Sequence, residues 1–174
     1  MFLELVAVIA AGIGGAGIAL LLGRLLGGRL PRWTAPVFAG AAMLGTTIAS
    51  EYGWYGRTAD ALPADMIVAE TVESRAAYRP WTYLVPYVDR FVAVDMATLR
   101  RHDDAPTTQI SDLYFFGRWQ ATRSATIVAD CAADRRAILS DGAAFAPDGQ
   151  IEGLLWVAPG DDDSILRTIC GGAG

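Results

Sequence analysis

The chain of 174 residues contains no lysine and no asparagine, and it has only one histidine and two cysteines. Without lysine it cannot form a Schiff base with a carbonyl substrate, and without asparagine it has no acceptor for N-linked glycosylation. Charged residues make up only 19% of the chain, and the net charge is −5. Because a nucleic-acid-binding protein needs a basic face to displace counterions from phosphates, this balance argues against nucleic acid as a partner.

Hydrophobic residues make up 53% of the chain, which excludes intrinsic disorder. The apolar excess is concentrated at the beginning, where Glu4 is the only acid among the first 50 residues. The remaining residues hold the other 18 of the 19 acids and 11 of the 14 arginines. This shift in composition predicts two domains, residues 1–55 and residues 56–174.

Two stretches without charge indicate transmembrane helices. Residues 5–23 would form a helix of roughly 28 Å, close to the thickness of the bilayer core. Residues 33–50 are less apolar, with Pro36 in the first turn and Thr34 as the expected cap. We expect spans over about 4–23 and 33–52. The alternatives are a cleaved signal peptide, which normally begins with positive charge, and two buried helices of a soluble protein.

The connection between the two stretches sets the expected orientation. It contains Arg24, Arg29 and Arg32 and no acid, and short loops rich in arginine stay in the cytoplasm. Both the N-terminus and the second domain then lie on the periplasmic side of a bacterial inner membrane. Aromatic residues mark the two membrane interfaces, Trp33 at one and the cluster Tyr52, Trp54 and Tyr55 at the other.

Small residues repeat at a spacing of four along both stretches, which lets helices approach closely in lipid. In the first stretch these residues are Ala7, Ala11, Gly15 and Ala19, and in the second they are Ala41, Gly45 and Ala49. The partner of either stripe is the other helix, a second copy of the chain or a larger membrane complex. Neither stretch contains His, Cys, Lys or Asp, so a transporter, a channel and a membrane haem protein are disfavoured.

The second domain is predicted to be mostly β. Apolar and polar residues alternate over residues 119–131, and residues 66–72, 90–99, 110–116 and 152–157 are further strand candidates. Residues 78–87 are expected to be extended, and the acids at 161–163 indicate a helix start rather than a calcium site. In an oxidising compartment Cys131 and Cys170 would form a disulfide, the alternative being two buried thiols. The expected fold is a membrane-anchored α+β protein, with a two-helix transmembrane hairpin followed by a small, mostly antiparallel-β extracytoplasmic domain.

Chemistry-bearing motifs are scarce. His102 lies in an Arg-Arg-His-Asp-Asp run, which is more typical of a solvated turn than of a catalytic triad, and no serine stands in a nucleophile motif. We therefore expect no catalytic residue, no metal and no cofactor. The predicted function is a non-catalytic accessory or scaffold subunit of an inner-membrane complex, with the lipid bilayer and other subunits or a second copy as partners. The alternative is a membrane-anchored periplasmic ligand-binding or sensor module.

Overall fold

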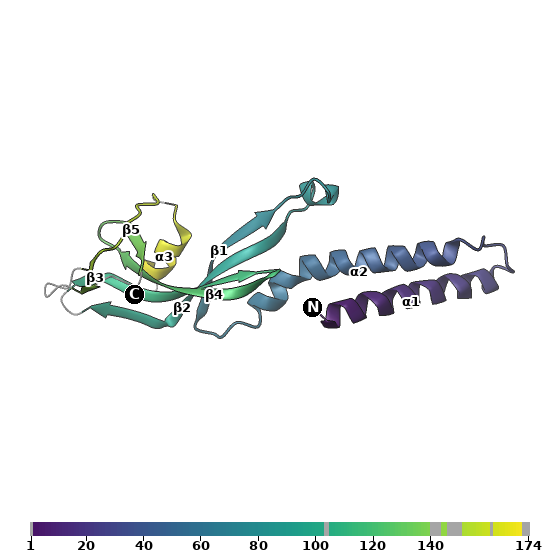
Figure 1. Ribbon diagram of the computed structural model, residues 1–174, viewed down its shortest axis with the longest axis horizontal. Coiled ribbons are helices and arrows are strands. Elements are labelled where there is room, and N and C mark those ends of the chain that lie inside the picture. The colour runs from purple at the N-terminus through teal and green to yellow at the C-terminus, as the bar shows by residue number, and fades with distance from the viewer. Residues whose placement is uncertain (1, 103–104, 140–143, 146–150, 161, 172–174) are drawn as a thin grey trace. The chain divides into compact units, whose positions relative to one another are not determined.

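The protein is an α+β protein with a helix-rich N-terminus, an antiparallel sheet of half-barrel form and one disulfide (Figure 1). The structure is a computed structural model and describes residues 2–102, 105–139, 144–145, 151–160 and 162–171. The chain divides into two compact units, Met1–Arg57 and Thr58–Gly174.

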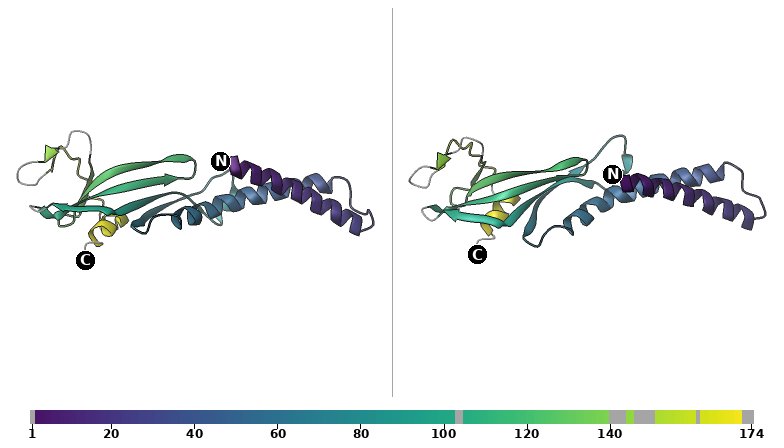
Figure 2. Two further views of the ribbon diagram at one scale, coloured as in Figure 1. Left: turned by 90° about the horizontal axis from the view of Figure 1, so that it is seen from below. Right: turned by 60° about the horizontal axis from the view of Figure 1, so that its bottom comes forward.

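The first unit is a pair of antiparallel helices, α1 (Phe2–Leu25) and α2 (Thr34–Ala59) (Figures 1 and 2). Three small residues of α1 are buried in this pair: Gly12, Gly15 and Ala19. A Cβ atom added at Gly15 would lie 2.7 Å from the carbonyl oxygen of Phe38. The two backbones therefore approach too closely there for any side chain larger than hydrogen.

Helix α1 is long and apolar enough to cross a membrane, and among the described helices it alone meets that standard. Only 17% of its most apolar stretch is buried, so most of its leucine and isoleucine side chains are exposed. The second expected span is a helix, but it is not shown to be a span. Its first two-thirds are built from alanine, glycine and threonine with few large apolar side chains, and its last turns contain Glu51 and Arg57.

Helix α1 ends in a Schellman motif. Gly27 and Gly28 have positive φ angles of 66° and 76°, which glycine adopts without a Cβ clash. The Gly28 amide donates to the Gly23 carbonyl at 2.8 Å, and the Gly27 amide donates to the Arg24 carbonyl at 3.1 Å. These bonds satisfy carbonyls that the last turn of the helix would otherwise leave open, and they turn the chain toward α2.

The second unit is built on a five-stranded meander in which each strand pairs with the next in antiparallel fashion. Its strands are β1 (Met66–Ser74), β2 (Tyr87–His102), β3 (Ala105–Gly117), β4 (Gln120–Asp130) and β5 (Arg135–Ile138). Four of them were predicted within a few residues of these bounds, because period-two alternation is a strong signal in long strands. A separate pair, β6 (Ala144–Phe145) and β7 (Ile151–Glu152), follows.

A bulge in β2 bends the sheet. Asp95 pairs with Asp112 and Arg100 with Ile110, so the four residues 96–99 lie opposite the single residue Ser111. The carbonyl of Asp95 accepts hydrogen bonds from the hydroxyls of Thr98 and Ser111, each at 2.9 Å. Bulges increase the local twist of a strand, and register shifts also occur between β1 and β2 and between β3 and β4.

The core of the second unit lies between the sheet and helix α3 (Ser164–Gly171). It consists of Val94, Leu113, Ile127, Ala129, Ile165, Leu166 and Ile169. The strands contribute every second residue, because side chains alternate between the two faces of a sheet. Helix α3 contributes the residues of one face, because side chains repeat every 3.6 residues around a helix.

Two predicted segments differ from the structure. The strand expected over residues 152–157 is reduced to the short β7 and an isolated bridge between Val157 and Arg136, because Gly153 turns the chain at φ 81°. The segment expected to be extended over 78–87 contains a 3-10 helix, η1 (Pro80–Tyr83), which begins at a proline.

Candidate interaction surfaces

The predicted disulfide is confirmed: Cys131 and Cys170 are bonded, at a sequence separation of 39. Cys131 directly follows β4, and Cys170 lies in the last turn of α3. The bridge therefore ties α3 to the sheet at the end of the core that these two elements share.

The acidic run before α3 begins the helix, as the sequence predicted. Asp163 Oδ1 accepts a hydrogen bond from the amide of Leu166 at 2.7 Å, which is the arrangement of an N-cap. Asp163 Oδ2 also accepts from two guanidinium nitrogens of Arg136, each at 2.9 Å. One carboxylate thus joins the start of α3 to strand β5, while residue 161 lies outside the described residues.

The small residues predicted to pack the helices separate into two groups. Gly15 and Ala19 are buried against α2, and Ala11 is half-buried. Ala7, Ala41, Gly45 and Ala49 are exposed on the helix pair. The face of α2 that lies against α1 instead carries Ala42 and Met43, which contact the positions of Gly15 and Gly12.

The residues predicted to set topology lie toward the two ends of the helix pair. Arg24, Arg29 and Arg32 are exposed at the connecting turn, and Trp33 beside them is also exposed. Tyr52, Trp54 and Tyr55 are half-buried in the later turns of α2. At the same end of the pair, the hydroxyl of Ser50 donates to Glu4 Oε1 at 2.9 Å, so this acid has a partner on the neighbouring helix.

Within the described part of the chain, no group of three or more His, Cys, Asp or Glu side chains is arranged to hold a metal ion. His102 ends β2, and the two acids that follow it lie outside the described residues. The first three residues of the run, 100–102, are therefore the end of a strand paired with β3 and not part of a turn.

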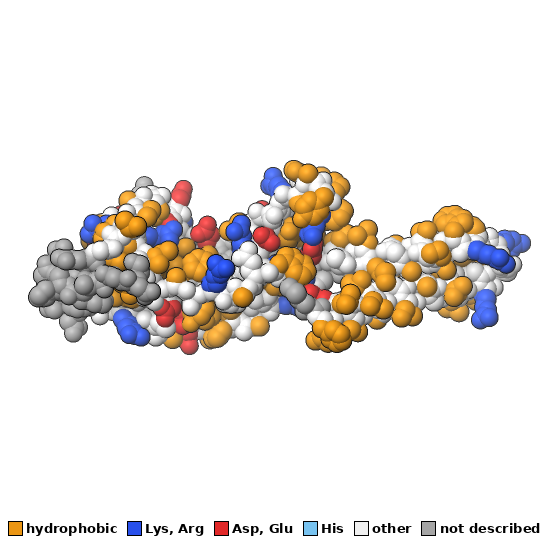
Figure 3. Space-filling view, in the orientation of Figure 1, with side chains coloured by type: hydrophobic (Ala, Val, Ile, Leu, Met, Phe, Trp, Pro, Cys, Tyr) orange, Lys and Arg blue, Asp and Glu red, His pale blue; other side chains and the backbone are white. Residues whose placement is uncertain are grey.

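The connection between β1 and β2 presents an exposed apolar surface. Tyr78, Tyr83 and Leu84 are 76%, 57% and 86% exposed, and we call these three residues the apolar tip. Apolar side chains, with a few arginines beside them, gather at this end of the β1–β2 hairpin in the space-filling view (Figure 3). The sequence between Glu73 and Asp89 contains no acid, whereas it contains Arg75 and Arg79.

The backbone beneath the apolar tip is fixed by a buried threonine. Thr82 is fully buried, its hydroxyl donates to the Arg79 carbonyl at 2.7 Å, and the same oxygen accepts from the Ala76 amide at 3.0 Å. The guanidinium of Arg79 lies over the rings of Tyr78 and Tyr87, 5.1 and 5.9 Å from their centroids. These contacts anchor the backbone of the tip, and an anchored surface loses less entropy when it binds a partner.

Sequence reasoning treated this connection only as an extended segment. The signal that was available is its composition: aromatic residues, leucine and two prolines without an acid, between two strands. Such a composition is unusual for an exposed loop, which is normally polar. Nothing in the sequence indicated that Thr82 would be the buried anchor, because its two backbone partners are defined only by the fold.

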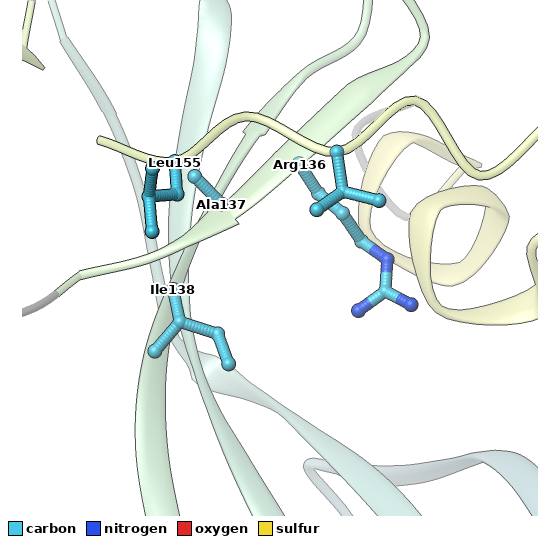
Figure 4. Close-up of a pocket in the computed structure, with 5 residues that line it drawn as sticks. Arg136, Ala137, Ile138 and Leu155 are labelled. Carbon is cyan, nitrogen blue, oxygen red and sulfur yellow. The ribbon is translucent and has the colours of Figure 1, made fainter.

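A second surface lies at the β5 edge of the sheet. Here a pocket of about 360 Å³ is lined by Ala137 and Ile138 of β5, by Leu155 and Val157 of the segment that crosses it, and by Arg136. Figure 4 shows Leu155, Ala137 and Ile138 around the opening, while the Arg136 side chain extends toward α3. Because Arg136 is paired with Asp163, the charge is satisfied and the pocket wall is apolar.

Comparison of the chain with models of known protein families, with curated proteins and with solved structures found no match.

Proposed function

We propose that this protein is a non-catalytic accessory or scaffold subunit of an inner-membrane protein complex. Helices α1 and α2 anchor it in the bilayer as a packed hairpin, and the second unit is a periplasmic interaction domain. The observation that carries the proposal is the apolar tip, where large apolar side chains are exposed on a backbone held rigid by Thr82.

The exposure of α1 supports the anchoring. Most of its leucine and isoleucine side chains are not covered, and an apolar surface of this length is stable in lipid but not in water. A core helix of a soluble protein would be mostly buried. The close approach at Gly12 and Gly15 supports a lasting hairpin over a cleaved signal peptide, since a cleaved segment has no need of a fitted partner. The weakly apolar α2 would then cross the bilayer as the partner of α1.

The orientation is supported by two features that lie far apart in sequence. The arginines at 24, 29 and 32 favour a cytoplasmic turn. The disulfide in the second unit favours the periplasm, where such bonds persist.

The chemistry of the apolar tip defines the partner that we propose. Its tyrosines and leucine lie beside Arg75 and Arg79, with no acid between Glu73 and Asp89. Buried aromatic anchors and arginine are typical of the energetic centre of protein interfaces. The complementary surface is an apolar pocket with acidic residues at its rim, on another subunit of the complex.

The test compares two leucines with the same exposure. Leu84 in the apolar tip is 86% exposed and Leu155 at the β5 pocket is 88% exposed. Leu84→Asp should weaken the apparent affinity of the protein for the complex by about 30-fold, as expected for an interface hot spot of about 2 kcal/mol. Less of the intact complex should then be recovered in mild detergent. Leu155→Asp should leave the native mass unchanged. A parent protein that migrates as a lone monomer contradicts the proposal.

The β5 pocket supports the second candidate, a membrane-anchored ligand-binding or sensor module. Its volume of about 360 Å³ lies at the lower end of the range for small-molecule sites, and its wall is apolar. In that case Leu155→Asp should abolish binding of an apolar ligand and Leu84→Asp should not. The same pair of variants thus separates the two candidates.

A further inference from the structure

The arginine-bearing end of the helix pair contains a pocket of about 540 Å³ that the proposed function does not use. Arg24 and Arg32 line it, together with the apolar side chains of Leu20 and Leu30 and with Thr34 at the start of α2. The space-filling view shows basic side chains gathered at this end of the pair (Figure 3). The pocket therefore combines two cations with an apolar wall.

The cations in this pocket are not neutralised by the described protein. The guanidinium groups of Arg24 and Arg32 have no hydrogen bond or ion pair to any residue that the structure describes. Glu4 and Glu51 are the only acids in the first unit, and both belong to the opposite end of the antiparallel pair. The local potential is consequently positive.

The two helix ends at the pocket have dipoles of opposite sign, because α1 ends there and α2 begins there, so the two guanidinium groups set the sign of the potential. The last carbonyls of α1 that face the turn, those of Gly23 and Arg24, are occupied by the amides of Gly28 and Gly27. The 26-residue helix α2 begins at Thr34 beside the pocket, and the positive end of its dipole favours an anion. Arginine adds a planar fork that matches a phosphate group.

We infer that this pocket binds the phosphate headgroup of an anionic phospholipid, with the acyl chains lying along the apolar surface of α1. A free phosphate ion shares the headgroup chemistry, but it would leave Leu20, Leu30 and the exposed Leu21 and Leu25 without an apolar partner. Basic pockets at the cytoplasmic end of transmembrane helices are where such headgroups bind.

This inference rests on the proposed anchoring, and two separate measurements test the anchoring and the lipid site. The full chain is mixed with vesicles of phosphatidylcholine alone, and its flotation tests the anchoring. The purified chain is then examined in mild detergent by native mass spectrometry, with phosphatidylglycerol and phosphatidylcholine in competition. A chain that does not float contradicts the anchoring. A chain that floats but binds both lipids equally contradicts only the lipid site.

Variants separate the pocket from general surface charge. Arg24→Gln and Arg32→Gln should each weaken the preference for phosphatidylglycerol about fivefold. The matched control is Arg29→Gln, because Arg29 lies in the same turn but does not line the pocket, and it should change the preference less than twofold. Equal losses in all three variants would contradict the pocket. The conservative variants Arg24→Lys and Arg32→Lys keep the charge and should retain most of the preference, which guards against a folding defect.

Inorganic phosphate provides the final comparison. Millimolar phosphate should not displace bound phosphatidylglycerol, because the acyl chains contribute to binding. Displacement by phosphate alone would assign the pocket to the free ion and overturn the inference.

Discussion

Replacing both Cys131 and Cys170 with serine should destabilise the second unit without unfolding it. The bridge closes a loop of 39 residues. In the chain-entropy model, a loop of that length contributes about 4 kcal/mol to the free energy of unfolding. The double substitution avoids leaving one free thiol that would form intermolecular disulfides.

The packing of α3 decides whether the variant stays folded. Ile165, Leu166 and Ile169 are buried against the sheet, and each contributes about 1.5 to 3 kcal/mol by burial. Their sum, roughly 5 to 9 kcal/mol before the entropy of ordering the helix, exceeds the contribution of the bridge. We therefore expect α3 to remain on the sheet in the reduced protein, with faster amide exchange over Ser164–Gly171.

Urea unfolding of the full chain in mild detergent, followed by tryptophan fluorescence, measures this effect. With a urea dependence of about 2 kcal/mol per molar, the midpoint should fall by about 2 M. Adding a reductant to the parent should lower its midpoint to that of the variant. A variant that unfolds at the parent's midpoint under oxidising conditions would refute the reasoning.

Three further substitutions test other parts of the structure. Asp163→Ala should cost about 2 to 3 kcal/mol in urea unfolding, because it removes the N-cap of α3 and the partner of Arg136, and Asp163→Asn, which keeps the cap, should cost about half as much. Equal costs would contradict the two roles of this carboxylate. Gly15→Ala should weaken the helix pair by about 1 to 3 kcal/mol in an SDS titration, since its Cβ would meet the Phe38 carbonyl, whereas Gly14→Ala, with open space around it, should be neutral or stabilising. If Gly15→Ala and Gly14→Ala changed the stability of the helix pair in the same direction, the helices would not pack through the face that contains Gly15. Thr82→Val should cost about 1 to 3 kcal/mol locally through its two lost hydrogen bonds. Hydrogen exchange at the Ala76 amide measures this cost, and unchanged protection would count against the rigid tip.

The sequence was sufficient for the elements whose signal is local. The helices, four of the five strands of the sheet, the helix start at the acidic run 161–163 and the disulfide each follow from hydropathy, alternation, charge or cysteine count. The packing face of α1 followed only in part, since Gly15 and Ala19 of the predicted stripe are buried. A spacing of four selected Ala7 and Ala11, whereas the structure buries Gly12 with Gly15 and Ala19, because two helices can meet along any row of small residues and the partner decides which.

The candidate sites were harder to predict than the fold. The apolar tip depends on Thr82, whose hydrogen bonds join residues three and six positions away through a turn that only the folded chain defines. The β5 pocket depends on a crossing of Val157 over Arg136, and these residues lie 21 positions apart. The sequence predicted the positive charge of the arginine pocket but not its cavity. The cavity depends on how the turn folds back at Gly27 and Gly28.

The central claim is that the apolar tip docks this anchored protein onto another membrane subunit. Its most direct test is a photo-crosslinking amino acid placed at position 84 in intact membranes, with position 155 as the matched site. We expect an adduct of one discrete protein mass from position 84 and none from position 155. Adducts with lipid alone, or a protein adduct from position 155 and not from position 84, would contradict it.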